Sequence, residues 1–224
     1  MTHLLRTAFH QNSNVGLYGF ANDKFCLLGT NVVHTIVQEI KDVLQVPTHT
    51  ISIASTSLVG ALVAGNNKCI LVPNIIFDSE LKQLDKLKIP YKVLETEFTA
   101  LGNNIVATDH AALISPDLEP LKDEIKKALQ VEHIRTMEID DLKVIGALVV
   151  LNDKGCLLSA HATEQDAAHV QKLFNVPVTR GTVNLGSPYV SSGIIVNKHG
   201  LVMGERTGGP EAVAIDEALG FLKK

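Results

Sequence analysis

The sequence repeats one pattern five times, at spacings of 42 to 45 residues. Each copy runs from an apolar stretch through a short polar turn into a second apolar stretch. The copies lie at 14–29, 58–73, 100–115, 144–159 and 191–204. The first turn residues are, in order, Asn22, Asn66, Thr108, Asn152 and Asn197. Because five such units account for the whole chain, its fold must be built from five equivalent parts.

Within each unit the pattern predicts three strands and a helix. Asparagine, aspartate and glycine in the turns, as in Asn22-Asp23-Lys24, tolerate the positive φ of tight hairpins, so each apolar pair is expected to form a β-hairpin. A strand rich in β-branched residues precedes each hairpin, and a helix with apolar residues three and four apart follows it. The β-β-β-α units lie at approximately 1–47, 48–90, 91–132, 133–177 and 178–224.

A single unit of this size cannot bury its own apolar faces, and stacking against neighbouring units solves that problem. An open array would need polar caps at its ends, yet the last segment, 212–222, is as apolar as the middle of the chain. We therefore predict one α/β domain in which the five units close into a pseudo-fivefold ring, a five-bladed α-β propeller.

Charge and hydropathy exclude several classes of partner. The formal net charge is −4 and tryptophan is absent. Binding nucleic acid through a broad basic surface requires many lysines and arginines to neutralise phosphates, so only local contact with nucleic acid is expected. No apolar stretch is long enough to span a bilayer and the N-terminus has no signal-peptide pattern, so we expect a cytoplasmic protein without membrane contact.

The residues that usually carry chemistry form no catalytic pattern here. Cys26, Cys69 and Cys156 occupy equivalent places among aliphatic residues and are interpreted as reduced core residues. The acidic and histidine residues between His161 and His169 offer a weak metal cluster, but a solvated helix face is the favoured interpretation. The glycines of 204–211 offer an anion site, with a helix cap as the favoured alternative. We expect no catalytic residue, no metal and no cofactor.

Departures from the repeat indicate where a partner could bind, because equivalent positions share a structural role. A glycine stands six residues before the turn in four units, whereas the fifth unit has Ser191 there. The residue after this position is an amide, Asn103, in the third unit. Segments 101–104 and 181–187 are therefore candidate contact patches, although turn formation explains their glycines and asparagines equally well. The candidate residues are Leu101, Gly102, Asn103, Asn104, Gly181, Thr182, Asn184, Gly186 and Ser187.

Several motifs together resemble the translation initiation factor 6 family. They are CILVPN (69–74), TALGNNI (99–105), LISPDLE (113–119), GTVNLGS (181–187) and TGGPEAVAIDEALG (207–220). They occur in the same order along the entire chain. Because the chain ends at Lys224, directly after the fifth helix, it resembles the archaeal form, which lacks the long eukaryotic tail. The resemblance implies a pentein-type fold.

The resemblance also implies a function and a partner. Members of this family bind the large ribosomal subunit and keep it apart from the small subunit, with a further role in large-subunit biogenesis. The implied partner is a basic ribosomal protein near the sarcin-ricin loop, with limited ribosomal RNA contact, which agrees with the acidic net charge. The family's functionally sensitive asparagine matches Asn103, whereas Ala61 replaces a basic side chain found in some relatives. A monomer is expected.

Two other hypotheses remain open. A catalytic pentein would use a cysteine nucleophile beside a central channel to modify guanidines, but it needs a cysteine late in the chain and none follows Cys156. A scaffold in some other assembly is the third hypothesis. A fold alone does not decide among them.

Overall fold

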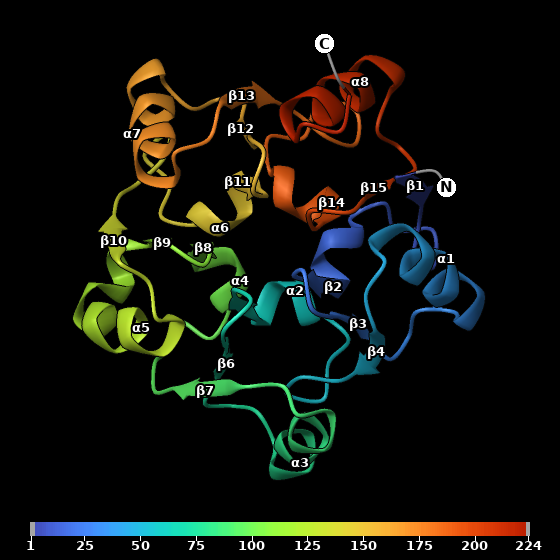
Figure 1. Ribbon diagram of the computed structural model, residues 1–224, viewed down its shortest axis with the longest axis vertical. Helices are drawn as coiled ribbons and strands as arrows, with labels where there is room; N and C mark the ends of the chain where they lie inside the picture. Colours follow the sequence, from blue (N-terminus) through green and yellow to red (C-terminus); the bar gives the residue numbers. More distant parts are fainter. Residues whose placement is uncertain (1–2, 223–224) are drawn as a thin grey trace.

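The computed structural model describes residues 3–222, which form a ring of five small sheets around a central axis (Figure 1). Each sheet has three strands, and a long helix lies at the outside of each (Figure 1). The blue N-terminal segment lies beside the red C-terminal segment, so the chain runs once around the ring (Figure 1). The predicted α/β ring of five units is confirmed.

Each sheet combines a hairpin with a third strand that comes later in the chain. In the first sheet, β2 (Gly19–Ala21) pairs antiparallel with β3 (Cys26–Gly29), and β3 pairs parallel with β4 (Thr48–Ile51). The other sheets are β5 (Ala64–Gly65), β6 (Ile70–Pro73) and β7 (Tyr91–Leu94); β8 (Ile105–Ala107), β9 (Ala111–Ile114) and β10 (His133–Thr136); β11 (Val149–Leu151), β12 (Cys156–Ser159) and β13 (Val178–Gly181); and β14 (Ile194–Val196), β15 (Leu201–Gly204) and β1 (Leu4–Thr7).

The ring is closed by its first strand. β1 pairs parallel with β15, from Leu4 opposite Leu201 to Thr7 opposite Gly204. Every sheet therefore takes its third strand from the following sequence repeat, and the last sheet takes it from the N-terminus. The sequence repeats and the sheets are out of step by one strand, because a parallel partner requires a crossover connection, which the outer helix provides.

Five longer helical segments form the outer layer of the ring. They are α1 (His34–Leu44), α3 (Asp78–Leu87), α5 (Lys122–Leu129) with the preceding 3-10 turn η2 (Pro116–Leu121), α7 (Glu164–Phe174) and α8 (Gly209–Ala218). Each packs an apolar side on its sheet, so the core consists of five clusters rather than one. The middle strands, such as β3 and β12, are buried at every residue.

Five short helical turns surround the axis, where the sequence pattern predicted only the first apolar stretch of each hairpin. They are η1 (Val15–Tyr18), α2 (Val59–Leu62), α4 (Leu101–Asn104), α6 (Ile145–Leu148) and η3 (Val190–Gly193). They explain the repeated glycine. A Cβ atom on Gly60 would lie 1.9 Å from the Gly16 carbonyl oxygen, and one on Gly102 would lie 2.0 Å from that of Gly60. Neighbouring turns can approach this closely only without a side chain.

The hairpin turns are confirmed, but the predicted reason for their asparagines is wrong. Among the described residues, no hairpin turn contains a positive φ. Instead, Asn22 Oδ1 accepts hydrogen bonds from the backbone N–H groups of Lys24 and Phe25, both at 2.9 Å, in an Asx turn. Its Nδ2 atom donates to the Asn66 carbonyl of the next unit, also at 2.9 Å. Asparagine recurs because one side chain both closes its own turn and binds the neighbouring unit.

Replacing an axial glycine tests the close approach at the axis. In Gly60→Ala the added Cβ would force α2 away from η1, so we expect the free energy of unfolding to fall by about 3 kcal/mol, the upper end of the usual cost of overpacking. For a chain of this size this corresponds to a fall in Tm of about 6–12 °C in a thermal unfolding experiment. Gly209→Ala is the matched control, because nothing lies within 4 Å of the new atom. Equal Tm values for the two variants would contradict the expectation.

Candidate functional site

The two ends of the ring differ because all five outer helices point the same way. α1 begins after β3 ends and returns to the start of β4, which lies parallel to β3, and every unit repeats this connection. We call the end with the helix N-termini, the inner helical turns and the loops after the leading strands the loop end. The opposite end, with the hairpin turns and the helix C-termini, is the turn end.

Charge follows the direction of the helices. Acidic residues in the first helical turns are Asp78, Glu80, Asp117, Glu119, Asp123, Glu124, Glu164, Asp166 and Glu211. Basic residues in the last turns are Lys41, Lys86, Lys126, Lys127 and Lys172. Carboxylates are favoured at helix N-termini and lysines at C-termini by the helix dipole. Because the helices are aligned, this preference makes the loop end acidic and the turn end basic.

Exposed apolar side chains also gather at the loop end. Of the nine large hydrophobic residues that are exposed among the described residues, seven belong to its loops and helix starts. They are Val33, Leu58, Ile75, Phe77, Phe98, Leu185 and Tyr189. Leu185 is the most exposed of them, at 67%. Scattered exposed leucines are ordinary, but a set concentrated at one end of a ring indicates a surface that binds another molecule.

In the first predicted patch, 101–104, some residues are buried in the fold and others lie at the surface. Leu101 is fully buried, and Asn104 is buried with its Nδ2 donating to the Ala100 carbonyl at 2.9 Å. Gly102 lies at the axis against the carbonyl of Gly60. Asn103 is half-buried, and its side chain makes no hydrogen bond within residues 3–222. Of this patch, therefore, only Asn103 presents a polar side chain that is not used by the fold.

The second predicted patch, 181–187, is also partly structural. Asn184 Nδ2 donates to the Ser13 carbonyl at 2.9 Å, which ties the fifth unit to the first. Gly181 ends β13, and Ser187 and Val183 exchange backbone hydrogen bonds at 2.8 and 3.0 Å. The exposed part is Leu185 and Gly186. Sequence reasoning missed Leu185, because it concentrated on polar and glycine residues.

Two glutamates, one buried (Glu80) and one half-buried (Glu211), fix the loops at this end. Glu80 accepts hydrogen bonds from the N–H groups of Ala54 and Ser55, at 2.8 and 2.9 Å, and from Ser52 Oγ at 2.7 Å. Burial would raise the pKa of Glu80, but the N–H group of Phe77 and these three donors outweigh it, so the pKa lies below its ordinary value.

Glu211 does the same for segment 181–187. Its carboxylate accepts from Thr182 Oγ1 at 2.6 Å and from the Gly186 and Gly208 N–H groups, both at 2.8 Å. Burial again opposes ionisation, and the hydrogen bonds from Thr182, Gly208, Gly186 and Leu185 lower the pKa of Glu211 overall. Because this carboxylate fills the start of α8, the glycines of 204–211 form a helix cap, as favoured above.

The two patches lie at the same end of the ring but do not touch. α4 carries the first, and η3 follows the second; α6 packs between these two inner turns and contacts both. In Figure 1 these three turns lie side by side around the axis. A partner that contacts Asn103 and Leu185 together must therefore cover about half of the loop end.

The three cysteines lie in the core, as the sequence pattern predicted. Cys26, Cys69 and Cys156 are buried, and burial raises the pKa of all three thiols, to about 12 for Cys156. A raised pKa disfavours the nucleophilic thiolate. The central channel, with a volume of about 140 Å³, is lined by glycine and apolar residues, Phe20 among them, with Ser191 and no ionisable side chain among the described residues.

No metal cluster forms around His161. Within the part of the chain that the structure describes, no three potential ligands come together. His161 Nδ1 lies 3.4 Å from Asp140 Oδ2, and Asp166 caps α7 by accepting from the Thr163 N–H group at 2.9 Å. The residues between His161 and His169 thus serve the exposed helix start. In the same described range, no helix is both long and apolar enough to cross a membrane.

The closed ring of five sheets with outer helices defines a pentein-type protein. A structure of DDAH from Pseudomonas aeruginosa, a mutant complexed with citrulline, matches with a TM-score of 0.51 over 77% of this chain and 69% of that chain. Its sequence identity is 9%, so the match shows the fold alone.

Sequence comparison identifies the family. Residues 4–218 match the model of the eIF-6 family. Proteins named translation initiation factor 6 are similar over nearly their full length: that of Thermococcus onnurineus is 37% identical, covering 98% of this chain and 99% of its own. Those of Pyrococcus abyssi and Methanocaldococcus jannaschii are 34% and 32% identical, covering 98% and 99% of this chain and 100% of their own. The chain belongs to the eIF-6 family.

The pKa of Glu80 predicts how stability depends on pH. Because this pKa is lowered in the fold, the ionised group stabilises the native state above its unfolded pKa of about 4.3, and this stabilisation is lost as the pH falls through the folded value. In Glu80→Gln an amide NH₂ would face N–H donors, so we expect the free energy of unfolding at pH 7 to fall by about 1–3 kcal/mol.

Urea unfolding at pH 7 and at about pH 3.5 measures the free energy of unfolding with Glu80 ionised and with it partly protonated. The difference between wild type and Glu80→Gln should shrink at the lower pH. Glu39→Gln, on the exposed side of α1, is the control and should change little at either pH. A difference that is as large at the lower pH as at pH 7 would show that the carboxylate charge is not the cause.

Proposed function

We propose that this protein is a translation initiation factor that binds the large ribosomal subunit through the loop end of its ring and thereby prevents association with the small subunit. Support for the translation role comes from the full-length similarity to proteins named translation initiation factor 6. A ribosomal partner follows from that role. The blocking action follows from geometry, since a rigid ring bound at the face where the subunits meet would exclude the other subunit sterically.

The observation that carries the proposal is the composition of the loop end. Acidic helix starts surround the exposed apolar residues there, of which Phe77, Leu185 and Tyr189 are examples. A basic ribosomal protein is complementary to such a surface, because opposite potentials steer association and the apolar residues supply binding energy once water is excluded. Limited contact with ribosomal RNA at the edge of the surface is compatible with this arrangement.

The loop end is held rigid, which favours a role in binding. Glu80 and Glu211 hold the loops at 52–58 and 182–187 in one conformation through networks of hydrogen bonds. A preorganised surface loses less conformational entropy on binding than a flexible one. Ala61 lies on α2, one of the inner turns at this end, so the basic contact that some relatives could make there is replaced by a methyl group.

An enzymatic role is the weaker alternative. The fold is shared with DDAH, solved with citrulline, but fold similarity at 9% identity carries no activity. The buried cysteines with raised pKa values and the apolar channel offer no nucleophile to a guanidine substrate. Binding therefore remains the better explanation of this structure.

Sedimentation of ribosomal subunits from an archaeon tests the proposed function. The protein should travel with the large subunit and not with the small one. Added in excess to a mixture of both, it should reduce the peak of associated ribosomes, and the reduction should depend on its concentration. Failure to travel with large subunits, together with unchanged association, would refute the proposal.

Two substitutions at the loop end test which residues make contact. Leu185→Asp removes an exposed apolar group at a positive φ that aspartate tolerates, and should weaken binding to the large subunit by about tenfold with little change in Tm. Asn103→Asp should also weaken binding, because the carboxylate loses the donor of the amide and must be desolvated.

Val213→Asp on α8 is the matched control, because Val213 is 52% exposed but lies outside the loop end. It should bind as the wild type does. If all three variants bind equally well, the loop end is not the contact surface. If Asn103→Asp lowers Tm as much as binding, Asn103 has a structural role instead.

A further inference from the structure

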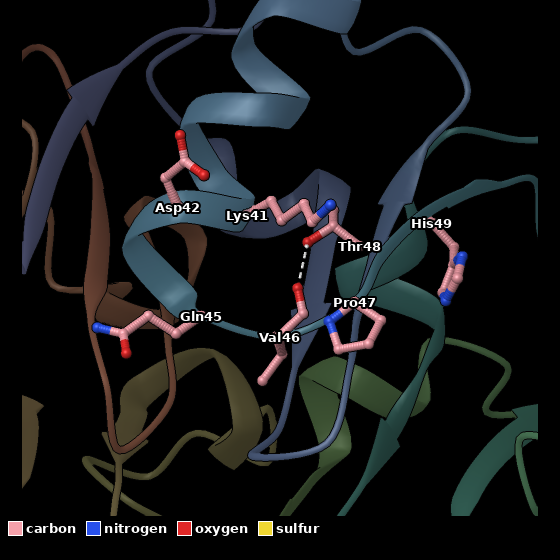
Figure 2. A pocket seen from close by; sticks show the side chains of 7 residues that line it. All are labelled: Lys41, Asp42, Gln45, Val46, Pro47, Thr48 and His49. Carbon is pink, nitrogen blue, oxygen red and sulfur yellow. Dashed lines mark hydrogen bonds between the residues drawn. The ribbon is translucent and has the colours of Figure 1, made fainter.

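A second candidate site lies at the opposite end of the ring, around the segment 46–49 that joins α1 to β4. A hollow of about 570 Å³ lies against this segment, and Lys41 and Asp42, which carry opposite charges, are among the residues that line it (Figure 2). Thr48 Oγ1 donates to the Val46 carbonyl at 3.2 Å, which holds the bend (Figure 2). His49 points to the other side of the segment (Figure 2), where a more enclosed hollow begins.

The second hollow is lined by basic and apolar residues. It has a volume of about 330 Å³ and lies between the first and second units at the turn end. Lys24, Lys88 and His49 contribute to its wall, together with the stem of Lys68, and its lining contains no carboxylate. Pro47 and Pro90 are among the apolar residues that line it. An amphipathic anion is the kind of ligand that fits such a lining.

A broken symmetry explains the surplus of positive charge. Between the second and third units, Lys68 Nζ donates to the carbonyl oxygens of Asp109 and Gln130, at 2.8 and 2.7 Å, so it links the units. Lys24 is the equivalent residue between the first and second units, yet it forms no hydrogen bond through its ammonium group and no ion pair within residues 3–222.

Lys88, at the end of the second outer helix, adds a further positive charge between the first and second units. Lys88 is the C-cap of α3 and has a left-handed backbone conformation. The equivalent C-caps of α1, α5 and α7 are uncharged: Gln45, Gln130 and Asn175. Lys88 is exposed and also lacks an ion pair in the described part of the chain. Two lysines therefore line one hollow whose lining holds no carboxylate, and an anion between them would link the units as Lys68 does one position further around the ring.

We propose that this hollow binds a nucleotide, with the phosphate between Lys24 and Lys88 and the base against the apolar residues around Pro47 and Pro90. The volume lies at the lower end of the range for small-molecule sites, which suits a single nucleotide unit. Lysine binds phosphate as a point charge, and an apolar lining accommodates a base. The nucleotide is either free or an unpaired residue of RNA; one local contact of this kind agrees with the acidic net charge.

This site is independent of the proposed ribosomal function, because it lies at the turn end and uses none of the loop-end residues. Both can hold at once. A protein docked through its loop end would leave the hollow open to a second ligand.

Titration calorimetry at low salt tests the site with four probes: AMP, a ten-residue oligouridylate, adenosine and inorganic phosphate. The wild-type protein should bind AMP or the oligonucleotide more tightly than either adenosine or phosphate alone. The double variant Lys24→Gln/Lys88→Gln should lose about tenfold or more in affinity. The matched control Lys127→Gln/Lys172→Gln removes the same charge from exposed positions on other helices and should keep the wild-type affinity.

The outcomes distinguish a free nucleotide from a nucleotide of RNA, and they include results that would overturn the proposal. Binding of AMP supports a free nucleotide, and binding of the oligonucleotide alone supports a nucleotide of RNA. The proposal is overturned if phosphate binds as tightly as AMP, if no probe binds at millimolar concentration, or if the control variant loses as much affinity as the double variant. Equal Tm values for wild type and both variants would exclude unfolding as the cause of any loss.

Discussion

The whole ring depends on the close approach of backbones at its axis. A Cβ on Gly16 would lie 1.9 Å from the Ser191 carbonyl oxygen, and the same contact recurs at Gly60, Gly102 and Gly146. These contacts bring the five inner turns together, and the pairing of β1 with β15 fixes the circumference. With both the centre and the perimeter closed, the loops at each end have fixed positions.

A single connection, repeated five times, gives the ring its two unlike ends. Each crossover helix returns the chain to the start of a parallel strand, so all helix N-termini lie at the loop end. Ordinary capping preferences, such as Glu80 and Glu211 at helix starts, then accumulate into an acidic end that carries most of the exposed apolar residues, and a basic end. The ring can thus present one surface to a basic partner and keep a separate, local site for an anion.

The candidate surface was only partly predictable from the sequence. Comparison of the repeats singled out Asn103, and the structure leaves its side chain free of hydrogen bonds among the described residues. The same comparison included Leu101 and Asn104, which are buried, because sequence spacing does not show which side of a short helical turn faces the protein. It included Asn184, whose amide joins the fifth unit to the first, and missed Leu185, since an exposed leucine has no sequence signature.

The sequence by itself determined the number of units, their strands and outer helices, the closed ring and the family, because each follows from a repeat or a motif that recurs at a fixed spacing. Only the tertiary structure decided what those repeats do. Asn22 and its equivalents join neighbouring units rather than adopt a positive φ, and the glycines admit a neighbouring backbone rather than a turn. It also decided which lysines have no side-chain partner within residues 3–222, as at Lys24 and Lys88. The contacts between neighbouring units join residues more than forty positions apart, so the identity of each partner depends on how the units pack in the ring.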